Sequence, residues 1–113
     1  MYSSARDMAV FLAANLGEFP VERSLREAMS LAQQDVWTIG PRNRQALAWE
    51  VLVGDAPTIT EKYGGLNNAS AYIGMMPRRK LGIVILGNRG NQYPNEVGRR
   101  ILLELAAFRR VRA

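Results

Sequence analysis

The chain has 113 residues, of which 48% are hydrophobic, and it carries a formal net charge of +5 at pH 7. This length suits one domain with a small core, and the composition is typical of a folded protein. The sequence contains no cysteine and no histidine, which excludes disulfides, thiolate metal ligands and a histidine base. We therefore expect no metal site and no cofactor.

The basic residues are mostly arginines, gathered at positions 78–79, 99–100 and 109–112. The first cluster falls at a predicted turn, and the last falls at a predicted helix end, where cations interact favourably with the helix dipole. Aromatic residues do not alternate with these arginines as they do in platforms for single-stranded nucleic acid. The sequence also begins without a basic region followed by a long apolar stretch. We therefore expect neither a nucleic-acid partner nor a membrane span, and the cellular location stays open.

Two helices are predicted near the start of the chain. Ser4 to Asp7 has the spacing of a helix cap, and the apolar stripe behind it ends at Gly17. This first stripe consists of Met8, Phe11, Leu12 and Leu16. Ser24 to Glu27 has the spacing of a second capping box. The stripe behind it consists of Leu25, Ala28, Met29 and Ala32, so we expect two helices that pack as a short pair.

Strands are predicted to follow at residues 47–53, 58–63, 69–76 and 81–86. Apolar residues alternate with other residues in the first of these strands and fill both faces of the last. Turns at residues 54–57 and 77–80 contain proline and join the strands into an antiparallel meander.

Pro94 suits the first turn of a final helix, whose apolar face can cover the sheet. That face consists of Val97, Ile101, Leu102, Leu105 and Phe108. We therefore predict an α+β fold in which residues 1–113 form a single domain. It should contain an antiparallel sheet of about four strands, two amino-terminal helices and one carboxyl-terminal helix.

A lysine motif is the most informative feature of the sequence. Residues 62–65 (Lys-Tyr-Gly-Gly) are followed by Tyr72 and by the run Leu-Gly-Ile-Val-Ile-Leu-Gly-Asn at residues 81–88. Residues 93–95 (Tyr-Pro-Asn) then precede the final helix. In this order the segments resemble the carboxyl-terminal part of class C β-lactamases and penicillin-binding-protein-like serine hydrolases, where a Lys-Thr-Gly strand lines the active site. The resemblance covers nearly the whole chain.

The resemblance implies catalytic roles for Lys62 and Gly65. The Lys62 ammonium would supply positive charge in a partly closed cleft, and the Gly65 N–H would form part of the oxyanion hole. Gly64 would let the chain approach the substrate closely, and Tyr63 and Asn95 would contact the substrate. If so, the Lys62 ammonium should face a groove open to solvent, and the Gly65 N–H should be free of sheet pairing.

Three features depart from the family pattern. No serine is followed by a lysine three residues later, so the sequence lacks the Ser-x-x-Lys nucleophile. Tyr63 replaces the motif threonine, which puts β-lactam recognition in question and makes an esterase-like or peptidase-like relative plausible. Gly98 stands where the family has an arginine near the substrate carboxylate, and Arg99 is one position out of register.

Other residues around the motif have structural interpretations. Tyr72 is predicted to pack in the core rather than to act in catalysis. Glu50 and Glu61 would be candidates for an acid–base pair, but a turn separates them and we expect both to lie on solvated faces. The glycines of the motif, together with the asparagines that follow, would alternatively form a flexible turn.

These observations predict a truncated serine hydrolase segment that carries the Lys-x-Gly strand and the oxyanion wall and is inactive alone. Alternatively, the chain is a non-enzymatic module that binds itself or a partner, or one half of a split esterase or D-Ala-D-Ala peptidase. In each case the surface that the family's amino-terminal half covers would be exposed. We therefore expect a homo-oligomer or a complex with that amino-terminal half, and a β-lactam, ester or peptide as the ligand.

Overall fold

The computed structural model describes residues 2–54 and 57–112, with side chains described as far as residue 108. Within these residues lie the helices α1 (Ala5–Asn15), α2 (Arg23–Ala32) and α3 (Pro94–Arg112) and the short 3₁₀ helix η1 (Pro77–Arg79). Helix α1 begins as predicted, because Ser4 Oγ accepts a hydrogen bond from the Asp7 N–H at 3.1 Å. Residues 55–56 of one predicted turn, and the side chains of the last arginine cluster, lie outside the described residues.

Helix α2 does not use the predicted capping box. Its N-cap residue is Glu22, and the Ser24 hydroxyl donates a hydrogen bond to Glu22 Oε1 at 2.7 Å. Leu25 remains 47% exposed, so its apolar stripe is only partly covered. The end of α2 nevertheless contacts the end of α1, as expected for a pair, because Gln33 Nε2 donates to the Asn15 carbonyl oxygen at 3.0 Å.

The sheet is an antiparallel meander whose six strands follow one another in chain order. They are β1 (Trp37–Thr38), β2 (Asn43–Gln45), β3 (Glu50–Leu52), β4 (Ile59–Leu66), β5 (Ala69–Met76) and β6 (Leu81–Gly87). The α+β class and the meander are confirmed, and β1 and β2 are additions to the predicted strands. They have only two and three residues, which is too short for an alternating pattern to show in the sequence.

The first predicted strand starts later than expected. Leu47 and Ala48 form a tight turn, in which Ala48 has a φ of 66°. The Ala46 N–H closes this turn by donating to the Trp49 carbonyl oxygen at 2.8 Å. Strand β3 therefore begins at Glu50, and the sequence concealed the turn because apolar residues continue through it.

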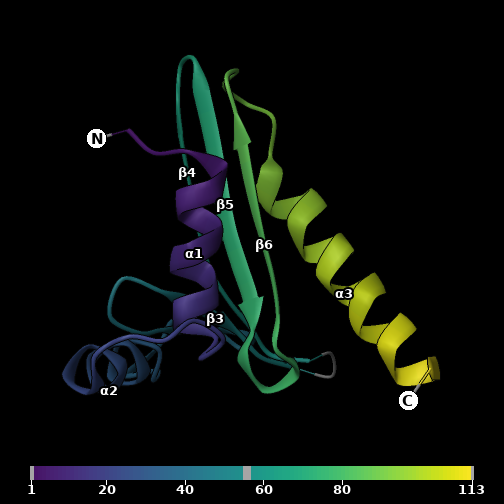
Figure 1. Cartoon of the computed structure of the whole chain (residues 1–113). Coiled ribbons are helices and arrows are strands. Elements are labelled where there is room, and N and C mark those ends of the chain that lie inside the picture. Colours follow the sequence, from purple (N-terminus) through teal and green to yellow (C-terminus); the bar gives the residue numbers. More distant parts are fainter. Residues whose placement is uncertain (1, 55–56, 113) are drawn as a thin grey trace.

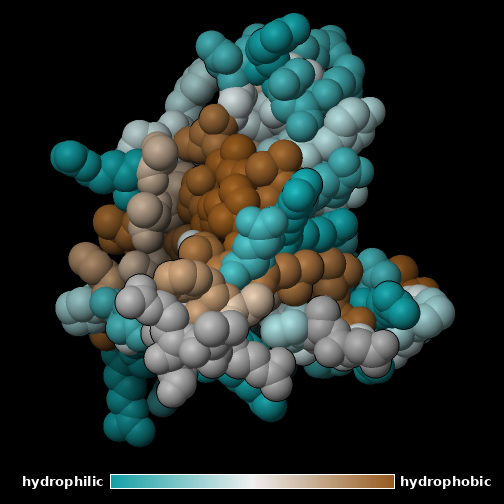
Figure 2. Space-filling model, turned by 90° about the vertical axis from the view of Figure 1, so that its right-hand side faces the viewer, coloured by the Kyte–Doolittle hydropathy of each residue, from teal (hydrophilic) through white to brown (hydrophobic). Residues whose placement is uncertain are grey.

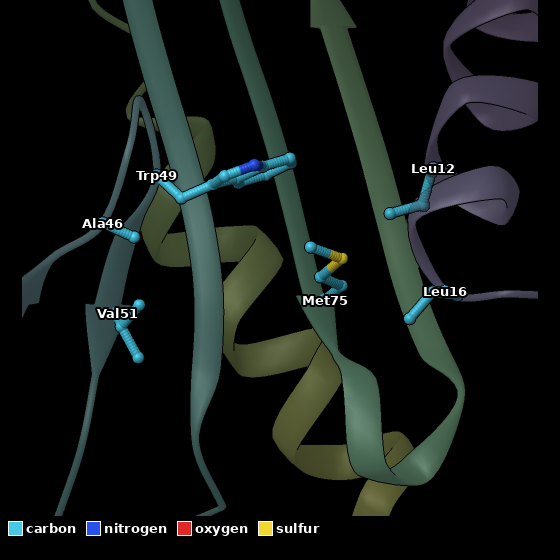
Figure 3. Packing of buried hydrophobic residues seen from close by; sticks show 6 residues of the cluster. All are labelled: Leu12, Leu16, Ala46, Trp49, Val51 and Met75. Atoms are coloured by element: carbon cyan, nitrogen blue, oxygen red, sulfur yellow. The ribbon is translucent and has the colours of Figure 1, made fainter. Parts of the chain in front are cut away.

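Helices cover both faces of the sheet, with α1 on one face and α3 on the other (Figure 1). The core on the α1 side contains Leu12, Leu16, Ala46, Trp49, Val51 and Met75 (Figure 3). The core under α3 contains Ile59, Met76, Leu102 and Ala106. Met75 and Met76 are neighbours in β5 and enter different cores, because successive side chains of a strand point to opposite faces.

Candidate active site

The lysine motif lies where β4 extends beyond its neighbour β3. The last residue pair between these strands is Glu50 with Glu61. Strand β4 continues to Leu66 and pairs there with β5 alone among the described residues. The motif, residues 62–65, therefore lies along a free strand edge.

The alternation of hydrogen bonds in an antiparallel ladder determines which N–H groups face this edge. The turn after Leu66 has two residues, so Leu66 belongs to the hydrogen-bonded pair that closes the hairpin with β5. Gly64, two residues earlier, is again in a hydrogen-bonded pair, opposite Ala71, whereas Gly65 lies opposite Ser70 in a non-hydrogen-bonded pair. The Gly65 N–H therefore points away from β5 and toward the free edge.

The pairing on the other side of β4 gives the same result independently. The Ala46 N–H bonds to the Trp49 carbonyl oxygen, so the next residue, Glu50, directs its backbone groups toward β4. Glu50 pairs there with Glu61, whose own backbone groups consequently face β3. Gly65 follows four residues later and faces the same side, where β3 has already ended.

Lys62 lies on the α1 side of the sheet, and its side chain is 55% exposed. Its Nζ lies 3.6 Å from Glu50 Oε1, so Glu50 is ion-paired and 28% exposed, where a fully solvated side chain was expected. Lys62 borders a largely apolar hollow of about 260 Å³, which Met8 of α1 and Ile73 of β5 also line. Lys62 thus borders a hollow on the α1 side of the sheet, while its ammonium is paired with Glu50.

A second hollow, of about 150 Å³, lies where the end of β4 and Ser70 of β5 meet the segment that leads into α3. It is lined by Tyr63, Gly64 and Gly65 of β4 and by Asn95 at the start of α3. The structure therefore brings four of the five candidate site residues together, whereas Lys62 borders the first hollow. Tyr63 and Gly64 line both hollows, so this part of β4 separates them.

The loop between β6 and α3 closes the second hollow with a strained backbone. Asn91 and Tyr93 line the hollow and have φ values of 55° and 48°. The left-handed region is tolerated by asparagine but is uncommon for a bulky residue such as tyrosine. Ser70 anchors the loop, because its hydroxyl donates to the Arg89 carbonyl oxygen at 2.9 Å. Backbone strain of this kind is concentrated at functional sites.

The prediction that Glu61 lies on a solvated face was wrong, because its side chain is 0% exposed. Its Oε1 accepts hydrogen bonds from the Tyr72 hydroxyl at 2.9 Å and from Arg99 Nε at 2.8 Å. Its Oε2 accepts one from Arg99 Nη2 at 2.5 Å. We call these three residues the buried triangle. Arg99 belongs to α3 and follows Glu61 by 38 residues, so the strand sequence carries no signal of this partner.

The buried triangle shifts the pKa values of two of its members. Tyr72 is in the core as predicted, and burial raises the pKa of its phenol, with a further increase from the charge of Glu61 and the hydrogen bond to it. The hydrogen bond to Glu61 raises the pKa of Arg99, against the opposing effect of partial burial. The phenol therefore stays neutral and the guanidinium stays charged well above neutral pH.

Two glycines make room for the Tyr72 ring. A Cβ at Gly74 would lie 2.3 Å from the Tyr72 hydroxyl oxygen, and a Cβ at Gly98 would lie 2.3 Å from Tyr72 Cε2. Both distances are far shorter than van der Waals contact. Gly98 is the position where the family resemblance places an arginine, and here a side chain would collide with Tyr72. The neighbouring Arg99 turns its guanidinium toward Glu61.

In the part of the chain that the structure describes, no helix is both long and apolar enough to cross a membrane. The same part contains no group of three or more Asp or Glu side chains that could hold a metal ion. The candidate site comprises the free edge of β4, the two hollows that residues of β4 line, and the buried triangle.

The helices on both faces of an antiparallel sheet define an α+β domain with a lysine strand at a free edge. A model of the beta-lactamase family matches residues 1–108, and the chain belongs to this family. A class C beta lactamase from Rhodobacter sphaeroides is similar with a TM-score of 0.79 and 24% identity, over 94% of this chain and 38% of that one.

Two further solved structures give the same picture. A beta-lactamase/D-alanine carboxypeptidase from Pseudomonas syringae has a TM-score of 0.76 and 25% identity, over 88% of this chain and 37% of that one. Another class C beta-lactamase has a TM-score of 0.73 and 20% identity, over 93% of this chain and 35% of that one. The chain therefore spans little more than a third of the length of these β-lactamases.

Proposed function

We propose that the chain forms one wall of a serine hydrolase active site and supplies no nucleophile of its own. The observation that carries the proposal is the direction of the Gly65 N–H, which faces the free edge of β4, the same strand that carries the exposed Lys62 side chain. A fixed N–H donor and a nearby cation are the groups that stabilise an oxyanion in acyl transfer. Because the sequence lacks a Ser-x-x-Lys motif, this wall alone should not hydrolyse a substrate.

The proposed ligand is an acyl compound, with an ester or peptide favoured over a β-lactam. Tyr63 is 47% exposed and lines both hollows, so its ring reduces the space that a threonine would leave open. Asn95 borders the second hollow together with Gly64 and Gly65. Its amide can donate to a carboxylate or carbonyl oxygen of a ligand that lies along the strand edge.

We further propose that the nucleophile comes from the part of the family fold that this chain does not span. Strand β6 offers an edge for pairing, because the ladder with β5 leaves the backbone groups of Gly82, Val84 and Leu86 facing outward. The strand contains no charged residue and no proline, which are the usual protections of a free edge. Seen from the side of α3, an apolar area occupies the middle of the molecule (Figure 2). A strand from the complementary part would cover this edge.

The test is intact-mass spectrometry after exposure of the purified chain to a fluorescent penicillin and to a short acyl ester. We expect no covalent adduct and no hydrolysis above background. Addition of a polypeptide containing the remaining part of a class C β-lactamase fold, with its Ser-x-x-Lys motif, is expected to produce acylation. The Gly65→Pro variant, which lacks the N–H donor, should not support it. An adduct on a serine of this chain would contradict the proposal.

The self-associating module is the second candidate, and the unprotected edge of β6 favours it. Two copies could pair antiparallel through this edge, which would satisfy the outward N–H groups of both. Analytical sedimentation tests it. A dimer that persists when the complementary polypeptide is added, without acylation, would favour the module over the active-site wall.

A further inference from the structure

The second hollow is bordered by two elements that one buried contact joins. Gly65 lies near the end of β4, and Asn95 lies in the first turn of α3. Glu61 precedes Gly65 by four residues, and Arg99 follows Asn95 by four residues. Four residues along a strand return to the same face, and four residues along a helix make about one turn. The Glu61–Arg99 pair therefore lies on the same face of β4 as Gly65 and on about the same face of α3 as Asn95, four residues further from the hollow along each element.

This pair differs in kind from the ion pairs on the surface. The Glu61 side chain is 0% exposed and the Arg99 side chain is 31% exposed. Two parallel hydrogen bonds join them, so the planar guanidinium fixes both the distance and the angle between β4 and α3. Arg100 and Glu104 form a pair on the same helix whose side chains are 82% and 69% exposed, and such pairs have little effect on structure.

We propose that Arg99 and Glu61 are positioning residues of this site: their bidentate pair sets the separation between the Gly65 N–H and the Asn95 side chain. The inference rests on the proposed function only in assigning these two groups to a ligand. Tyr72 completes the arrangement. Its hydroxyl donates a hydrogen bond to Glu61 Oε1 from the β5 side, and this bond fixes the orientation of the carboxylate. A lysine ammonium in place of the Arg99 guanidinium would still attract the Glu61 carboxylate, but it would no longer fix the angle between β4 and α3.

The experiment compares Arg99→Lys with the matched control Arg100→Lys in the whole chain. Backbone and side-chain amide signals are recorded by NMR on nitrogen-labelled protein, together with urea unfolding. Arg99→Lys is expected to stay folded and to shift the Gly65 backbone amide and the Asn95 amides more than amides of β1 and β2. Arg100→Lys is expected to leave the Gly65 and Asn95 signals at their wild-type positions.

A second variant, Glu61→Gln, keeps the size of the side chain and is expected to shift the same signals. A purely structural role predicts a lower urea midpoint with Gly65 and Asn95 signals unchanged in the folded protein, and that result would overturn the proposal. Equal shifts in Arg99→Lys and Arg100→Lys would overturn it as well. This experiment uses neither penicillin nor the complementary polypeptide. Its outcome therefore tests this inference alone, and the acylation assay tests the proposed function.

Discussion

Two neighbouring residues of β4 form ion pairs of opposite character. Glu61 is completely buried and holds Arg99 through two hydrogen bonds, whereas Lys62 is 55% exposed and lies 3.6 Å from Glu50. Their side chains point to opposite faces of the sheet, as successive strand residues must. The comparison teaches that one strand can place a buried anchor of the fold and an exposed charge at consecutive positions.

The largest effect is expected from Glu61→Gln. Removing one partner of a buried pair leaves an uncompensated charge, which typically costs about 3–5 kcal/mol. Arg99 keeps some contact with solvent, so we expect a loss of about 3 kcal/mol in the free energy of unfolding, measured in urea. Glu50→Gln is the control, because Glu50 lies opposite Glu61 in the neighbouring strand and its pair with Lys62 is partly exposed. A loss as large in the control would remove the distinction between the two pairs.

Gly98→Ala should destabilise the fold by crowding the buried triangle. The new Cβ would lie 2.3 Å from Tyr72 Cε2, and overpacking of this kind costs about 2 kcal/mol. Gly64→Ala is the control, because a Cβ there would meet nothing within 4 Å. Thermal unfolding of the two variants distinguishes them. If the melting temperature of Gly98→Ala equals that of the wild type, the close packing of Tyr72 is not as described.

Tyr72→Phe removes one hydrogen bond to a buried carboxylate, which is worth about 1.5–3 kcal/mol at neutral pH. Burial raises the pKa of Tyr72 above its usual value near 10, so the folded protein binds the phenolic proton more tightly than the unfolded chain. This contribution is complete below about pH 10 and is lost as the pH rises above that value. Urea unfolding at several pH values should therefore show the difference between variant and wild type shrinking above pH 10. A difference that grows there would contradict the assignment.

Lys62→Ala should have the smallest effect on stability. Its pair with Glu50 is partly exposed and long, and surface pairs of this kind contribute about 1 kcal/mol or less. The same variant is expected to weaken acylation in the complemented assay described above, because the proposed active-site wall loses its exposed cation. Urea unfolding combined with that assay separates the two outcomes. A large loss of stability would assign Lys62 to the fold rather than to the site.

Much of the fold could be predicted from local patterns. The Ser4 cap, the residues that end α1 and the long strands β4 to β6 follow from capping and alternation rules that depend on near neighbours. The motif order from residues 62–65 to Asn95 also identified the family. These features are local in sequence, which is why a single chain reveals them.

The buried triangle could not be predicted in the same way. The sequence around Glu61 predicts a solvent-exposed charged residue. Its burial depends instead on an arginine 38 residues away, which the placement of α3 brings into contact. Gly98 was interpreted as a missing arginine, whereas the structure explains it by the volume of Tyr72. The turn at Leu47 was concealed for another reason, because its apolar residues prolong the pattern of a strand. Tertiary packing therefore decided Glu61 and Gly98, whereas the turn at Leu47 was hidden by its own apolar residues.

Hydrogen exchange of the two adjacent glycine amides in the motif tests the central claim most directly. Gly64 and Gly65 are both exposed, and only the alternation of the β4–β5 ladder distinguishes their N–H groups. Residue-resolved exchange by NMR should show a protected Gly64 N–H and a Gly65 N–H that exchanges freely with solvent. A Gly65 N–H as protected as that of Gly64, or more so, would mean that the proposed oxyanion donor is occupied within the sheet, and would contradict the account.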